Sequence, residues 1–149
     1  MIVPVMDPYE WLPGYGESGV RLEAISREAL SVRLVYDSPE DRSVSLSRAL
    51  TFDNPLDFRL CRFPGPIGLG RPVPAVPENG VPYEERAWHP GMLGIVDPSE
   101  AAASWSRTLG RSDGVKEYTL QLVGEDLLLS VVAESFSLGP EGPAPDGVA

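Results

Sequence analysis

Residues 20–63 read VRLEAISREALSVRLVYDSPEDRSVSLSRALTFDNPLDFRLCRF, and this stretch decides the fold class. Apolar residues occupy alternate positions along it, with Arg, Glu, Ser or Asp between them. A period of two is typical of β-strands that bury one face, and it predicts strands at 20–24, 30–36, 44–46 and 56–60. Turn-forming residues stand between these segments, so the stretch is expected to form a four-stranded antiparallel meander.

The C-terminal half continues the same pattern. Residues 115–123 alternate and predict a strand with one buried face. Residues 127–138 form the last predicted strand, and because residues 127–133 are apolar on both faces, this strand is expected to be central. Between the two halves, Asp97 is the expected N-cap of a short helix over 98–109. Trp105 is expected to be buried against the sheet, and Gly110 to end the helix in the left-handed conformation.

Prolines and glycines divide the remaining chain. Residues 1–18 are expected to be irregular and to lie across the core, because they combine Pro and Gly with large aromatic side chains. Residues 64–91 hold seven prolines and predict a long loop with a short edge strand at 81–88. Residues 140–149 predict a flexible tail after a single domain over 1–139. The expected fold is therefore mostly β, an antiparallel sandwich or curled sheet of about seven or eight strands with one short helix.

The charge of the chain restricts its partners. Its 149 residues include 12 Lys and Arg against 22 Asp and Glu, a net charge of −10, with a pI near 4.5. Such a chain repels phosphate backbones and anionic membranes, so neither nucleic acid nor membrane binding is expected. No signal-peptide pattern or membrane-length apolar run is present, and the expected location is the cytoplasm. A protein with a basic surface is the partner that this charge favours.

Catalytic chemistry has few candidate residues. Cys61 is the only cysteine and His89 the only histidine, too few soft ligands for structural zinc. Residues 110–114 (GRSDG) match Gly-x-Ser-x-Gly, but they follow the predicted helix and do not join a strand to a helix, so they predict no nucleophile elbow. The glycines of 65–70 lack the Lys and Ser or Thr of a phosphate loop. The prediction is a protein without cofactor or metal that is not an enzyme.

Two acidic segments are the candidate contact surface. One lies in the predicted turn between the second and third strands, and the other combines acidic and aromatic residues in the proline-rich segment. Aromatic anchors within an acidic rim are typical of protein-binding patches. The predicted partner-binding residues are Glu40, Asp41, Glu84, Glu85, Trp88 and His89.

Three alternatives stay open from the residues alone. The loop at 64–91 could roof a small-molecule pocket lined by Phe63, Tyr83 and Trp88. His89 could act as an acid or base with Glu84 or Glu85. The chain could also be a structural subunit of a bacterial assembly, which its Pro and Gly content fits.

Three segments in order also suggest a family. Residues 50–59 (LTFDNPLDFR), the helix at 100–105 and the strands from 118–120 to 129–135 resemble small β-rich proteins found beside bacterial polymorphic toxins and assigned as immunity proteins. The resemblance implies an acidic inhibitor that neutralises a basic toxin by occluding its site. The proline-rich segment at 64–91 departs from that pattern, and the resemblance transfers no functional residue.

Overall fold

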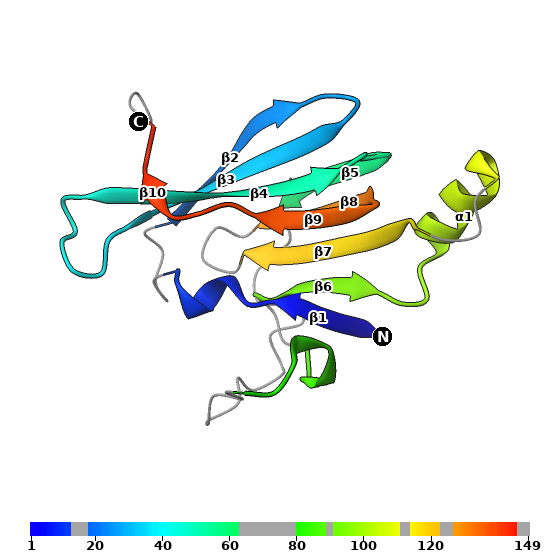
Figure 1. Cartoon of the computed structure of the whole chain (residues 1–149), viewed down its shortest axis with the longest axis horizontal. Helices are drawn as coiled ribbons and strands as arrows, with labels where there is room; N and C mark the ends of the chain where they lie inside the picture. The colour runs from blue at the N-terminus through cyan, green and yellow to red at the C-terminus, as the bar shows by residue number, and fades with distance from the viewer. Residues whose placement is uncertain (13–17, 63–79, 89–90, 111–113, 123–126, 146–149) are drawn as a thin grey trace.

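The structure is a computed structural model that describes residues 1–12, 18–62, 80–88, 91–110, 114–122 and 127–145. These residues form two antiparallel sheets with one α-helix and two short 3-10 helices, as expected for a mostly β fold (Figure 1). Sheet A contains, in spatial order, β1 (Ile2–Met6), β6 (Leu93–Val96), β7 (Lys116–Leu122), β8 (Leu127–Ala133) and β5 (Asp57–Arg62). Sheet B contains β10 (Gly142–Pro143), β4 (Ser45–Asp53), β3 (Ala29–Asp37) and β2 (Ser18–Ile25), with β9 (Ser135–Leu138) also paired to β4.

Strand β3 supplies the most deeply buried row of side chains. It lies between β2 and β4, and its inward residues are at most 3% exposed: Leu30, Val32, Leu34 and Tyr36. Phe52 and Leu50 of β4 stand directly opposite the first two, and both are fully buried. Each such side chain stabilises the fold by about 1.5–3 kcal/mol through burial alone.

The two sheets are joined at a corner where the chain passes twice from one sheet to the other. Strand β4 runs into β5 through Asn54, and β8 runs into β9 through Glu134. Asn54 adopts a positive φ of 50°, and its amide Nδ2 donates to Glu134 Oε2 at 2.9 Å. The predicted meander is therefore right for its first three strands and wrong for the fourth, because the corner carries β5 into sheet A. The single last strand predicted over 127–138 is also wrong, because the chain changes sheets at Glu134 and divides it into β8 and β9.

Aromatic side chains fill the space between the sheets behind this corner. The ring of Tyr118 on β7 lies 5.4 Å from that of Phe52 on β4 and 5.5 Å from that of Phe136 on β9, measured between centroids. Such tilted ring pairs contribute about 0.5–1.5 kcal/mol beyond their burial. The two sheets consequently share one core.

The N-terminal segment is more regular than predicted. Residues 2–6 form β1 despite Pro4, and they pair with β6, a strand that the sequence did not indicate. A proline is tolerated here because β1 ends sheet A and has a ladder partner on one side only. The prediction of an irregular segment over 1–18 is therefore wrong for residues 2–6.

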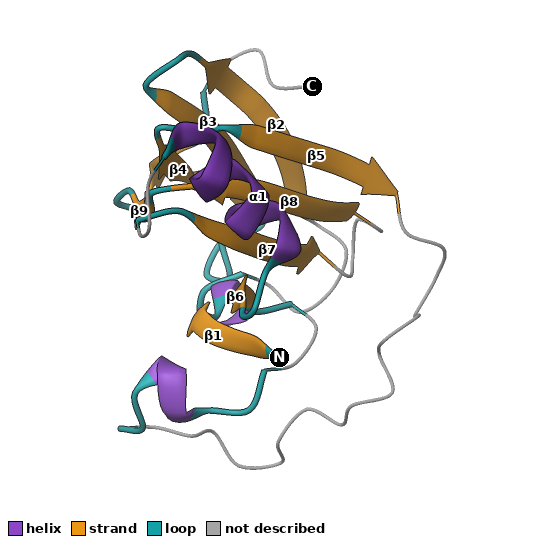
Figure 2. Ribbon diagram, turned by 90° about the vertical axis from the view of Figure 1, so that its right-hand side faces the viewer, coloured by secondary structure: helices purple, strands orange, loops and turns teal. Residues whose placement is uncertain are grey.

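The helix α1 (Glu100–Leu109) begins two residues later than predicted. Ser99, not Asp97, is its N-cap: Ser99 keeps an extended φ of −113°, and its Oγ accepts from the N–H of Ala102 at 3.0 Å. Gly110 ends the helix with φ 68°, as expected. The helix lies at the end of sheet A where β7 begins, so it stands in front of the strands when the molecule is viewed from that end (Figure 2). Its only buried residue is Ala102. Trp105 is half-buried, so its expected place in the core is wrong.

Two further predicted segments differ from the structure. Residues 83–85 of the proline-rich segment form the 3-10 helix η2 (Tyr83–Glu85), and no strand is found over 81–88; residues 63–79 lie outside those described. The predicted free tail from residue 140 pairs with β4 at residues 142 and 143. That pairing uses backbone groups, which is why a segment without apolar anchors is held. No helix among the described residues is long and apolar enough to cross a membrane.

Candidate functional site

The turn between β3 and β4 presents the first predicted acidic pair to solvent. Glu40 and Asp41 are both exposed. The carboxylate of Asp41 accepts from the backbone N–H of Ser43 at 3.0 Å and from its hydroxyl at 2.7 Å. These hydrogen bonds favour the ionised form and lower the pKa of Asp41. Asp41 therefore shapes the turn, whereas the side chain of Glu40 is available to a partner.

The second acidic segment surrounds η2. Glu85 is exposed, and so is Glu10 of the 3-10 helix η1 (Pro8–Glu10). Between them, Arg86 donates from Nη1 to Glu10 Oε1 at 3.3 Å and stacks over the ring of Tyr83, with Cζ 4.2 Å from its centroid. Burial, then the hydrogen bond and charge of Glu10, raise the pKa of Tyr83 to about 12. The acidic η2 segment is thus fastened to η1.

A chain of contacts links η1 to the β3–β4 hairpin. The ring of Trp11 lies 5.4 Å from that of Tyr36, the last inward residue of β3. The Tyr36 hydroxyl donates to the carboxylate of Glu141, next to β10, and burial followed by this bond raises the pKa of Tyr36. Tertiary contacts therefore connect the acidic segments at η2, η1 and β10 with the end of β3.

We call the exposed acidic residues of these connected segments the acidic end: Glu10, Glu40, Asp41, Glu85 and Glu141. The β3–β4 turn forms one end of the longest axis, whereas Glu85 lies on η2, which packs against β1 nearer the middle of that axis (Figure 1). Three arginines lie near it: Arg42 is exposed in the same turn as Asp41, and Arg48 and Arg86 are held by internal contacts. Arg48 donates from Nε to the carbonyl of Gly139 at 3.0 Å and covers the Trp11 ring, and Arg86 also donates to the carbonyl of Val81. The five carboxylates outnumber these three guanidinium groups, so the net charge of this set of residues is negative.

The other predicted contact residues are Trp88, Glu84 and His89, and none of them is shown as an exposed contact residue. Trp88 is half-buried: its Nε1 donates to the carbonyl of Met92 at 3.3 Å, and it lies over Gly94, where an added Cβ would stand 2.9 Å from its ring. Trp88 therefore fastens the loop to sheet A. The side chain of Glu84 and all of His89 lie outside the described residues, and with them the predicted acid–base pair and the pocket of Phe63.

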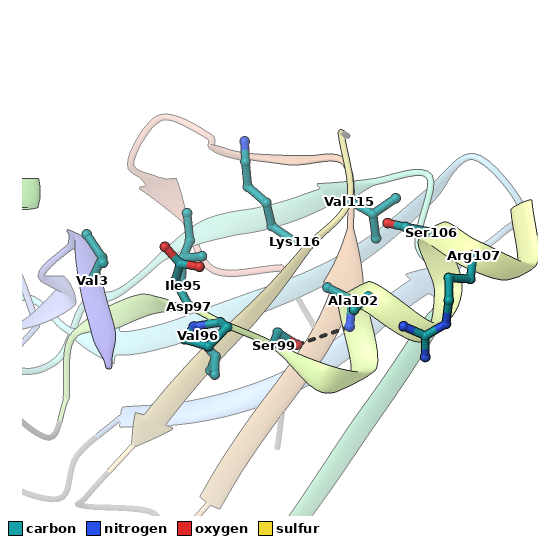
Figure 3. Close-up of a pocket in the computed structure, with 12 residues that line it drawn as sticks. Val3, Ile95, Val96, Asp97, Ser99, Ala102, Ser106, Arg107, Val115 and Lys116 are labelled. Atoms are coloured by element: carbon teal, nitrogen blue, oxygen red, sulfur yellow. Dashed lines mark hydrogen bonds between the residues drawn. The ribbon is translucent and has the colours of Figure 1, made fainter. Parts of the chain in front are cut away.

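A groove lies beside α1, at the end of the longest axis opposite the β3–β4 turn (Figures 1 and 3). It measures about 730 Å³ and is open to solvent. Its walls are the first turns of α1 and the ends of β1, β6 and β7, with Arg107, Lys116 and Asp97 as its charged residues. Ser99, on the helical side, also donates to Glu117. These residues offer a shallow surface and no converging set of nucleophile, base and oxyanion donors.

The described residues hold no group of three or more His, Cys, Asp or Glu placed to bind a metal ion. Cys61 is exposed on β5. Glu10 and Glu141 were not among the predicted contact residues, because only tertiary contacts bring them to the acidic end and no local pattern marks them. Comparisons of the chain with protein families, with curated proteins and with solved structures find no match in any of the three.

Proposed function

We propose that this protein is a non-catalytic binding module that docks on a basic partner protein through its acidic end. The observation that carries the proposal is the charge of the acidic end, whose exposed carboxylates outnumber the nearby arginines Arg42, Arg48 and Arg86. A field of this kind steers a basic protein towards the surface and accelerates association.

The specific form of the proposal is an immunity-type inhibitor that neutralises a basic toxin in the bacterial cytoplasm. The net charge of −10 and the small β-rich fold support it, together with the sequence resemblance. An inhibitor of this type needs no catalytic group, because it acts by covering the toxin's site. Its affinity depends on matching the partner's shape and charge.

The test begins with capture of the tagged protein's partners from a bacterial lysate at low and at high salt. We expect a basic protein that is retained at low salt and released at high salt, because screening weakens the attraction between opposite charges. The association rate of that partner is then measured with the double variant Glu40→Lys/Glu85→Lys. These two residues are chosen because their reversal leaves the Asp41 turn intact.

The matched control is Glu28→Lys/Glu100→Lys, which changes the net charge equally at exposed residues outside the acidic end. We expect the acidic-end variant to slow association by about tenfold or more and to flatten its salt dependence, and the control to have a small effect. Equal effects of the two variants would show that only net charge matters and would contradict the assignment of the site. Capture of no basic partner at low salt would contradict the proposed function itself.

A further inference from the structure

On its outer side, strand β5 pairs with no other described strand. It is the last strand of its sheet, and among the described strands only β8 pairs with it, in an unbroken register from Asp57 to Arg62. Five of its six residues are exposed, and Leu60 is 41% exposed although it stands opposite the buried Leu129. A regular edge with free backbone N–H and C=O groups is a template for another strand.

The other described edges are interrupted in ways that prevent such pairing. Strand β1 contains Pro4 and a register shift after it, and β2 has a register shift between Leu22 and Ala24. Beyond β4, the edge consists of the short β9 and the two-residue β10, which includes Pro143. Prolines, irregularities and short strands are the means by which sheets avoid edge-to-edge association. Strand β5 contains no proline, glycine or register shift.

We propose that the β5 edge pairs with the β5 edge of a second copy of this chain, in antiparallel orientation about a two-fold axis. Such an axis is perpendicular to the sheet and preserves its faces. It therefore lies midway between one residue and the same residue of the other copy, and these two residues pair. If the axis lies between the two copies of Leu60, these leucines are opposite each other, and Phe58 is opposite the other copy's Arg62. If it lies between the two copies of Arg59, two guanidinium groups are directly opposite each other.

The arrangement about Leu60 is favoured by its side-chain pairs. It brings together two exposed leucines and places each Arg62 against an aromatic ring, a geometry that permits cation–π contact. No like charges are directly opposite in it, whereas an Arg59 pair would destabilise the interface. In this register the side chains of β5 complement those of a second β5, which is why we propose a second copy of the chain as the partner. Pairing of the two edges joins sheet A of each copy into one continuous sheet.

The inferred dimer is independent of the proposed function, and its salt dependence has the opposite sign. A single added strand is small beside the roughly 1,600 Å² of a standard interface, so association is expected at micromolar concentrations or above. Two chains of charge −10 repel each other, and salt screens that repulsion. Dimerisation therefore strengthens with salt, whereas binding of a basic partner weakens.

The experiment is sedimentation equilibrium of the full chain from about 10 μM to 1 mM, at about 50 and 500 mM NaCl. We expect the mean mass to rise towards that of a dimer with concentration, and more steeply at high salt. Hydrogen exchange on the same samples should show protection of the β5 amides that grows with protein concentration. A monomer mass throughout, with unprotected β5 amides, would overturn the proposal and leave the edge to another protein.

Two matched variants locate the interface. Leu60→Lys places two ammonium groups opposite each other on the two-fold axis and is expected to raise the dimer dissociation constant by at least about tenfold. Leu22→Lys changes a residue of similar exposure, 46%, on the interrupted edge of β2 and should leave the constant within about twofold. Equal loss of the dimer in both variants would overturn the assignment to β5. Thermal unfolding of each variant confirms that it is folded.

Discussion

Strands β3 and β5 have similar sequences and opposite surroundings. Both alternate apolar residues with arginine, as in LSVRLVY at 30–36 and FRLCR at 58–62. On β3 the inward leucines are at most 1% exposed, whereas Leu60 of β5 is 41% exposed. The difference arises from position in the sheet, because β3 has a strand on each side and β5 has one neighbour. Alternation therefore identifies a strand with one apolar face and does not report how completely that face is covered.

The largest expected effect tests this difference in burial directly. Leu34→Ala on β3 removes a side chain that is 1% exposed, and it should lower the free energy of unfolding by about 2–5 kcal/mol. Leu60→Ala on β5 should cost under about 1 kcal/mol, because its side chain already contacts water. Urea unfolding of the two variants at low protein concentration measures both. Similar losses would mean that the β5 row is covered in solution.

The same reasoning explains how much of the fold the sequence predicts. The buried rows of β3 and β4 follow from alternation, and so does the central place of β8, which is apolar on both faces. The place of β5 does not follow, because it depends on the corner at Asn54 and Glu134, whose contacts join residues 80 positions apart. Strand β1 was missed because proline density excludes central strands but not edge strands.

Some features of the candidate site also follow from the sequence, and others do not. The exposure of Glu40 and Glu85 follows from their place in polar turns, and the structure confirms it. The connection of Glu10 and Glu141 with these segments depends on the contact between Trp11 and Tyr36 and on the bonds that Arg86 and Tyr36 donate, which no local pattern specifies. The cap of α1 was misplaced because Asp97 and Ser99 are equally good capping residues, and only the extended backbone of Ser99 decides between them.

An intermediate effect is expected at the residue that connects β4 to β5. Asn54 has a positive φ, and its side chain bonds Glu134 across the corner. Asn54→Ala should cost about 1–2 kcal/mol, because alanine tolerates this conformation poorly and leaves the carboxylate without that donor. Asn54→Gly keeps the conformation and removes only the hydrogen bond, so it should cost less. If the two variants unfold at the same urea concentration, backbone conformation is not what holds the corner.

The smallest expected effect is the dependence of stability on pH. It arises at the end of β3, where Tyr36 lies, and not at β5, which contains no tyrosine. The folded state raises the pKa of Tyr36, and that of Tyr83 to about 12 from its ordinary value of 10.0, chiefly by burial. Because the unfolded chain then loses these protons first, the stability from both groups is fully present below about pH 10 and falls as pH rises towards 12. Absorbance at 295 nm should show ionisation delayed above pH 10 in the folded protein, and Tyr83→Phe should flatten the loss of stability. Ionisation of every tyrosine near pH 10 without unfolding would mean that solvent reaches these hydroxyls, and the contacts that join η1 and η2 to the β3–β4 hairpin would then be absent in solution.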